Sequence, residues 1–168
     1  ADIRVTAVDR DQKRINQVSD NLERLGLNAD VLCLDVEKWH TTSRFDCILL
    51  DVPCSATGII RRHPDIKLLR TKSDIDKLFR VQSLLLNKVF DLLVTGGELL
   101  YSTCSILHQE NDEVIARFLT THSNVEQLPI FLDGHEESVV TTRYGLQLLP
   151  TINDHDGFYY ARLRRTPE

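Results

Sequence analysis

The chain has 168 residues, of which 42% are hydrophobic and 27% are charged, and its formal net charge is -5. This composition indicates one globular domain with a full core and excludes a disordered chain. The acidic balance disfavours non-specific nucleic-acid binding through overall charge, although it leaves room for a local basic patch. No apolar run approaches the roughly 20 residues that span a bilayer, and the first ten residues lack the apolar region of a signal peptide. We therefore expect a cytoplasmic protein that does not associate with membranes.

The four cysteines lack the close Cys-x-x-Cys spacing of zinc or thioredoxin-type sites, so no metal site is predicted. A chain of this size does not need disulfides for stability, and we expect its thiols to be reduced. Cys33 and Cys47 lie within apolar runs and are predicted to be core residues.

Apolar periodicity predicts strands and helices in alternation along the chain. We expect strands over residues 3–8, 29–34, 45–50, 99–101 and 158–163, and helices over residues 12–25, 74–94 and 111–121. Asp11 is placed to cap the first helix and Gly26 to end it. Residues 53–74 are predicted to form a polar connection, and residues 125–147 to hold one strand and a variable loop. This order is typical of an α/β fold with a doubly wound, mostly parallel sheet of the Rossmann-like kind.

Nucleotide-binding sheets of this kind begin with a strand that runs into a glycine-rich turn. No such turn precedes Asp9. We therefore expect residues 1–168 to be the C-terminal part of a larger domain, whose first strand and glycine-rich loop lie outside this sequence.

Three predicted strands end in a carboxylate, at Asp9, Asp35 and Asp51. Since the carboxyl ends of parallel strands meet at one edge of the sheet, these residues are expected to line one crevice. There they can accept hydrogen bonds from the ribose and adenine of a nucleoside-bearing cofactor. The alternative is that each one only caps the following helix or turn.

Cys54 and Cys104 each follow a predicted strand and lie among Ser, Thr and Pro residues rather than Leu and Val. A thiolate in such a place can act as a nucleophile when its pKa is lowered. The alternative is that each is an ordinary packed cysteine. Asp51 lies close to Cys54 in the sequence, which makes the combination more specific than either cysteine alone.

Residues 61–72 form a basic segment in an otherwise acidic chain. Five positive side chains against one negative give a charge of +4, from Arg61, Arg62, Lys67, Arg70 and Lys72 against Asp65. The segment is either a phosphate-binding edge beside the site or a solvated loop.

Residues 51–58 (DVPCSATG), 61–65 (RRHPD) and 101–105 (YSTCS) resemble motifs of the RNA 5-methylcytosine methyltransferases. The similarity extends over essentially the whole chain, and the RRHPD segment resembles the members that act on bacterial small-subunit (16S) ribosomal RNA. The resemblance implies an S-adenosylmethionine-dependent methyltransferase fold and an enzyme that methylates C5 of a cytosine. The family's glycine-containing motif I and the RNA-binding region that precedes it have no counterpart here.

By this resemblance Cys104 is the nucleophile that adds to C6 of the base, and Cys54 assists its release. Asp51 lies between cofactor and base, Asp9 binds the ribose of S-adenosylmethionine, and Asp35 binds its adenine. The implied partner is small-subunit ribosomal RNA, with a flipped target base. The alternative from another class is a non-catalytic RNA-binding or assembly module that keeps the fold without binding the cofactor.

Overall fold

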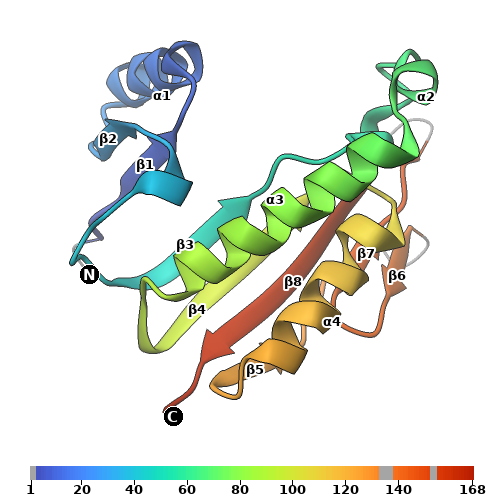
Figure 1. The fold of residues 1–168 in the computed structure, drawn as a ribbon. Helices are drawn as coiled ribbons and strands as arrows, with labels where there is room; N and C mark the ends of the chain where they lie inside the picture. Colours follow the sequence, from blue (N-terminus) through green and yellow to red (C-terminus); the bar gives the residue numbers. More distant parts are fainter. Residues whose placement is uncertain (1–2, 133–137, 152–154) are drawn as a thin grey trace. The chain divides into compact units, whose positions relative to one another are not determined.

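The computed structural model describes residues 3–132, 138–151 and 155–168 (Figure 1). The chain folds into two compact units, residues 1–42 and residues 43–168. Among the helices of these described ranges, none is both long and apolar enough to cross a membrane.

The first unit is a β-α-β arrangement. Strands β1 (Thr6–Asp9) and β2 (Asp30–Cys33) pair in parallel, and helix α1 (Gln12–Leu25) connects them. The carboxylate of Asp11 accepts the backbone N–H of Lys13, and Gly26 ends the helix with a φ of 65° that favours glycine. The predicted cap and stop of this helix are therefore confirmed.

The second unit contains a six-stranded sheet in the order β3-β4-β8-β7-β6, with β5 also paired to β8. Its strands are β3 (Phe45–Asp51), β4 (Leu93–Thr103), β5 (Val125–Leu128), β6 (Val139–Thr141), β7 (Leu146–Leu148) and β8 (Phe158–Arg165). Its helices are α2 (Ile66–Leu69), α3 (Lys72–Phe90) and α4 (Asp112–Thr121). The pair β3–β4 is parallel, whereas β8 is antiparallel to β4, β5 and β7. The predicted α/β class is confirmed, and the sheet of this unit is mixed.

Helices α3 and α4 lie on one face of this sheet (Figure 1). The core between them is formed by fully buried apolar side chains, including Leu86, Phe90, Leu93, Leu99, Tyr101, Val114, Ile115, Tyr159 and Leu163. Because side chains alternate along a strand, Cys47 and Leu49 of β3 point away from the face that carries buried Leu50. Cys47 is exposed and Leu49 is 69% exposed, and Cys33 at the end of β2 is exposed as well. The prediction that both cysteines are core residues is therefore wrong.

The first and last strands are shifted by a few residues from the prediction, to Thr6–Asp9 and Phe158–Arg165, and two other regions differ more. Helix α3 begins after a capping box between Thr71 and Asp74 and ends at Phe90, so that Leu93 and Val94 already belong to β4. The range 125–147 holds the three short strands β5, β6 and β7 instead of one, and residues 133–137 of it lie outside the described residues.

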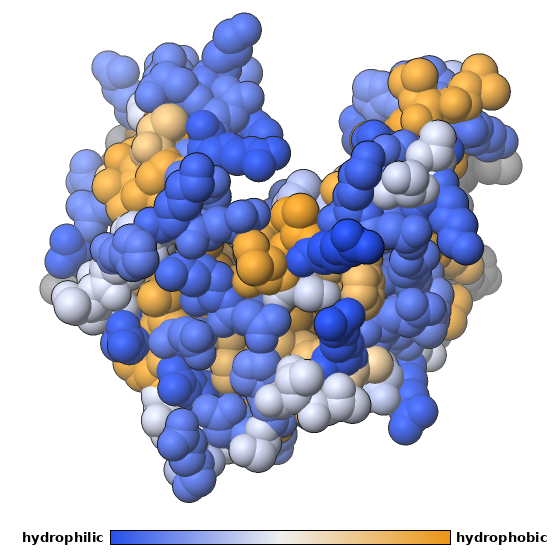
Figure 2. Space-filling view, viewed as in Figure 1, coloured by the Kyte–Doolittle hydropathy of each residue, from blue (hydrophilic) through white to orange (hydrophobic). Residues whose placement is uncertain are grey.

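The predicted polar connection contains the one-turn helix α2. Its Leu68 and Leu69 are 87% and 65% exposed, and they form an apolar patch at the upper right of Figure 2, over α2. This patch interrupts the basic segment of residues 61–72.

Candidate functional site

The parallel pairing of β3 and β4 brings two reactive loops together. Asp51 at the end of β3 is directly opposite Ser102 of β4, and each strand then continues into a loop that carries a cysteine. The Sγ atoms of Cys54 and Cys104 lie 3.4 Å apart, within hydrogen-bonding distance for sulfur. The structure therefore brings these two predicted residues together, although 50 residues separate them in the sequence.

The pKa values of the two thiols shift in opposite directions. The hydrogen bond from Cys54 is the largest cause that lowers the pKa of Cys104, since it stabilises the Cys104 thiolate. The same hydrogen bond, followed by burial and by the charge of Cys104, raises the pKa of Cys54 far above that of an ordinary thiol. The pair therefore favours a thiolate on Cys104 and a proton on Cys54.

Asp51 belongs to the same group of side chains. Its negative charge opposes the lowering of the Cys104 pKa, and together with burial it raises the pKa of Tyr160. Tyr160 lies on β8 and is paired with Ser102, so Asp51, Ser102 and Tyr160 form one row across three strands. The three residues predicted to be catalytic thus meet at one end of β3 and β4.

The loop that carries Cys54 is held by side chains of α3 and of the segment before it. Gln82 donates to the carbonyl of Pro53 at 2.9 Å, and Arg70 donates through Nε to the carbonyl of Ser55 at 3.0 Å. Ala56 has a φ of 61°, a left-handed conformation that is unfavourable for a residue other than glycine. The loop therefore has a fixed conformation that its local sequence alone does not favour.

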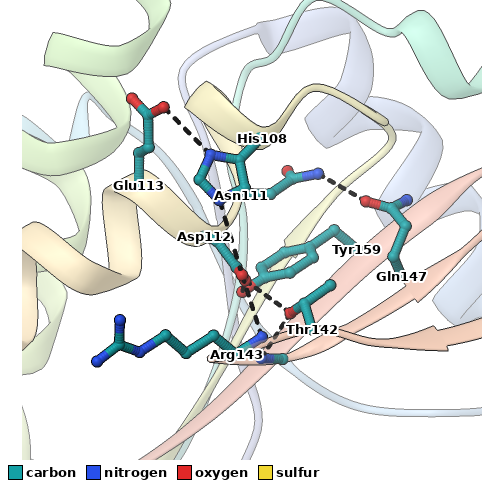
Figure 3. A network of polar contacts seen from close by, with 9 residues as sticks. His108, Asn111, Asp112, Glu113, Thr142, Arg143, Gln147 and Tyr159 are labelled. Atoms are coloured by element: carbon teal, nitrogen blue, oxygen red, sulfur yellow. Dashed lines mark hydrogen bonds and ion pairs between the residues drawn. The ribbon is translucent and has the colours of Figure 1, made fainter.

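The loop that carries Cys104 is held by Asn111, which precedes α4 (Figure 3). Asn111 accepts the hydroxyl of Thr103 at 2.7 Å through Oδ1, and its Nδ2 donates to the carbonyl of Ser105 at 3.0 Å. Nδ2 also donates to Gln147 at 2.8 Å. One buried amide therefore fixes the residues on both sides of Cys104.

The next residue, Asp112, joins α4 to β8 and to the connection after β6 (Figure 3). It is 5% exposed, and its Oδ1 accepts hydroxyl groups from Tyr159 and Thr142, each at 2.7 Å. Burial and the hydrogen bond to Asp112 raise the pKa of Tyr159. This network keeps the helix that follows the Cys104 loop attached to the sheet.

Sequence reasoning did not identify these supporting residues. The sequence held a signal for Gln82, because this polar residue lies at helical spacing in the same row as the apolar Ile75, Leu86 and Val89. The structure shows that α3 buries this row, and Gln82 is fully buried in it. Asn111 left none, because Asn at a helix start is expected to cap the helix, whereas here its side chain makes no capping bond.

Asp9 and Asp35 belong to the first unit. Asp9 accepts the N–H of Asp11 at 2.8 Å and lies 3.2 Å from Arg14, and Asp35 accepts the N–H of Glu37 at 3.1 Å. Both carboxylates thus have the local role that was the alternative interpretation. A carboxylate has about four acceptor positions, so each can also accept a ribose or adenine donor. These acceptors fit the hydroxyl and amino donors of a nucleoside, and the crevice shared with Asp51 stays a prediction because it would combine both units.

Three arginines of the basic segment form contacts within the protein. Arg61 and Arg62 form ion pairs with Asp156, whose side chain is 11% exposed, and Arg70 binds the carbonyl of Ser55. Lys67 and Lys72 are exposed. The segment therefore fastens the loop of Cys54 and still presents positive charge to solvent.

Comparisons with known proteins show the family of the chain. The family model described as "16S rRNA methyltransferase RsmB/F" matches residues 1–164. The chain belongs to the RsmB/F family. The predicted resemblance is thereby confirmed.

Relatives in this family include proteins named ribosomal RNA small subunit methyltransferase B. The one from Coxiella burnetii, named as probable, is 45% identical over 97% of this chain, and the one from Yersinia enterocolitica is 46% identical over 96%. A crystal structure of a methyltransferase homolog from Pyrococcus horikoshii is 30% identical, with a TM-score of 0.79, and the match covers 98% of this chain and 54% of that one. The chain spans 38% and 36% of the length of the two curated relatives.

Proposed function

We propose that the protein transfers a methyl group from S-adenosylmethionine to C5 of a cytosine in small-subunit (16S) ribosomal RNA, through a covalent adduct between Cys104 and C6. The observation that carries this proposal is the pair of thiols at 3.4 Å beside Asp51, in a member of the RsmB/F family. The proposal includes work in the cytoplasm on ribosomal RNA, and the name of the relative from Yersinia enterocolitica, ribosomal RNA small subunit methyltransferase B, supports the RNA substrate.

Cytosine needs a nucleophile because C5 of the aromatic ring reacts poorly with electrophiles. The Cys104 thiolate forms a bond to C6, and the displaced ring electrons make C5 reactive. With the base bound, Asp51 in its protonated form would donate a hydrogen bond to N3 and stabilise the negative charge that the addition of Cys104 puts on the ring. S-adenosylmethionine supplies an electrophilic methyl group on a sulfonium.

The properties of Cys54 suit it to the release step. Its pKa is raised by the hydrogen bond to Cys104, by burial and by the charge of the Cys104 thiolate, and the first and third of these causes disappear once Cys104 is bonded to C6. Cys54 can then release its proton to solvent and take the proton from C5. The electrons of the C5–H bond restore the ring double bond as the C6–S bond breaks, and Cys104 leaves as a thiolate. One proton is released overall, and the resting pair is regenerated.

We also propose that residues 1–168 are the C-terminal part of the methyltransferase domain. The coverage of 36–38% of the length of the curated relatives supports this. Asp9 and Asp35 would hold the ribose and adenine, and the exposed lysines of the basic segment would contact phosphates.

The test is a pair of cysteine substitutions in the full-length protein, with 16S ribosomal RNA as substrate. We expect Cys104→Ala to abolish methyl transfer and Cys54→Ala to accumulate a covalent protein–RNA adduct on a denaturing gel. Cys47→Ala is the matched control, because Cys47 lies on the face of β3 opposite to buried Leu50 and takes no part in the thiol pair, and it should behave as wild type.

The reverse pattern would show that the two roles are exchanged. Bisulfite sequencing of ribosomal RNA from cells that lack the protein tests the reaction itself. An unchanged cytosine pattern would contradict the enzymatic proposal and favour the non-catalytic RNA-binding module. Calorimetry with S-adenosylmethionine then separates loss of cofactor binding from loss of chemistry.

A further inference from the structure

Glu110 is a buried acidic residue that has no part in the reaction proposed above. It ends the short helix η3 (His108–Glu110), and its side chain is 0% exposed. Its Oε1 accepts the backbone N–H of Ser55 at 2.8 Å and Nε2 of Gln82 at 3.1 Å. Its Oε2 accepts the hydroxyls of Ser55 at 2.5 Å and Ser105 at 2.6 Å. A carboxylate with four donors is a satisfied buried charge, and removing its partners is costly.

The partners of this carboxylate have a particular place in the chain. Ser55 directly follows Cys54, and Ser105 directly follows Cys104. Both serines are 0% exposed, and besides the shorter bonds to Glu110 their hydroxyls lie 3.3 Å from each other and 3.2 and 3.0 Å from the hydroxyl of Thr57. Glu110 therefore binds the residue next to each reactive thiol, from a position 55 residues away from the first and five from the second.

We propose that Glu110 is a positioning residue, whose carboxylate ties the loop of Cys54 to the loop of Cys104 and so holds the two Sγ atoms at hydrogen-bonding distance. The proposal rests on the proposed function in one respect, namely that Cys104 is the nucleophile. Gln82 extends the tie, since its Nε2 donates both to Glu110 and to the carbonyl of Pro53.

The tie and a simple charge effect predict opposite shifts of the Cys104 pKa when Glu110 is changed. The charged or titratable groups that act on Cys104 are Cys54, Asp51 and Glu110. The hydrogen bond from Cys54 lowers the pKa of Cys104 most, while the negative charges of Asp51 and Glu110 raise it. If Glu110 acted only as a charge, its removal would lower the pKa of Cys104. If it acts as a tie, loosening it weakens the bond between the thiols, and the pKa of Cys104 rises.

Two substitutions of Glu110 separate these roles. Glu110→Asp keeps the charge but retracts the carboxylate by about 1.5 Å, one carbon–carbon bond, so it cannot reach both serines. Glu110→Gln keeps the length of the side chain but removes the charge and turns one acceptor oxygen into a donor, so it should speed alkylation if Glu110 acts only as a charge and slow it if Glu110 is the tie. Ser105→Ala removes one of the four bonds to Glu110, and with it the contacts of the same hydroxyl with Ser55, Thr57 and the N–H of Leu107.

The readout is the rate at which iodoacetamide alkylates Cys104 in the intact protein across a pH series, measured by peptide mass spectrometry. The exposed thiols Cys33 and Cys47 are internal references. Only the thiolate reacts, so each unit by which the pKa rises slows the reaction about tenfold at a pH below that pKa. We expect Glu110→Asp and Ser105→Ala each to slow alkylation of Cys104 at neutral pH about tenfold, with the references unchanged.

Glu113→Gln is the matched control, because Glu113 is an exposed acid that contacts His108 instead of the cysteine loops, and it should leave the profile unchanged. An unchanged or faster reaction of Cys104 in Glu110→Asp and Ser105→Ala would overturn the proposal. If the Asp variant does not give a folded melting curve, Ser105→Ala decides. Alkylation needs neither RNA nor S-adenosylmethionine, so a failure of the proposed methyltransferase function would not affect this result.

Discussion

Gly58 lies where three loops of the site meet, and we predict that Gly58→Ala both destabilises the fold and separates the two thiols. Its N–H donates to the carbonyl of Cys104 at 2.8 Å, and its own carbonyl accepts the N–H of Gly157 at 2.9 Å. A Cβ atom at residue 58 would lie 2.1 Å from the carbonyl oxygen of Gly157 and 2.9 Å from that of Cys104. Both contacts are with backbone, so no side-chain rotation can relieve them.

The magnitude follows from the contacts that must change. Overpacking of this kind costs about 1–3 kcal/mol, and the two backbone hydrogen bonds contribute about 1 kcal/mol each. The expected loss of unfolding free energy is therefore about 3–5 kcal/mol, set against roughly 5–15 kcal/mol for a typical domain. For a protein of this size, about 2–4 °C is lost per kcal/mol, so the melting temperature should fall by about 10 °C.

The assay combines a thermal melt with alkylation of Cys104 at neutral pH. Gly96→Ala is the matched control, since Gly96 has a φ of 85° and a Cβ added there would have no other atom within 4 Å. Only backbone strain of about 1 kcal/mol is therefore expected in the control. Equal melting temperatures for the two variants, with normal reactivity of Cys104 in Gly58→Ala, would refute the reasoning.

Two further predictions concern the buried network and the thiol pair. Asp112→Asn replaces one carboxylate oxygen by an NH2 donor and removes the charge, so the hydrogen bond from the Tyr159 hydroxyl is lost or weakened. We expect the free energy of unfolding in urea to fall by about 1–3 kcal/mol. An unchanged urea midpoint would mean that the network does not contribute to stability. Hydrogen peroxide should join Cys54 to Cys104, because their Sγ atoms at 3.4 Å need to approach by only about 1.4 Å to reach the disulfide length. The oxidant takes up the two thiol hydrogens as water forms, so mass spectrometry should show the loss of two hydrogens, reversed by a reducing agent, and a bond to Cys47 instead would contradict the prediction.

The order of elements could be predicted from the sequence because most segments have one strong period. Helix α1 combined an Asp cap and a terminal glycine, and both were confirmed. Residues 92–94 could not be assigned in this way, because a short apolar run fits the end of a helix as well as the start of a strand. The strands β6 and β7 have three residues each, too few for an alternating pattern to be distinguished from a loop.

The site divides in the same manner. Cys54 and Cys104 could be found because each follows a strand and is surrounded by small polar residues. Glu110 could not, since an acid near a helix start is usually explained by the helix itself, and its partner Ser55 is 55 residues away. Cys47 was misjudged because the apolar run of β3 was taken to be buried on both faces, whereas the described residues cover only one of them.

The strained turn after Cys54 explains why the site needs so many buried hydrogen bonds. β3 and β4 end in register, yet Cys54 comes three residues after Asp51 while Cys104 comes two after Ser102. The left-handed Ala56 turns the chain back so that the next loop residues reach the Cys104 carbonyl. Such a conformation costs about 1 kcal/mol or more for a residue with a Cβ. Ser55, the residue before Ala56, donates its N–H and its hydroxyl to the buried carboxylate of Glu110. These two hydrogen bonds offset the cost of the left-handed conformation.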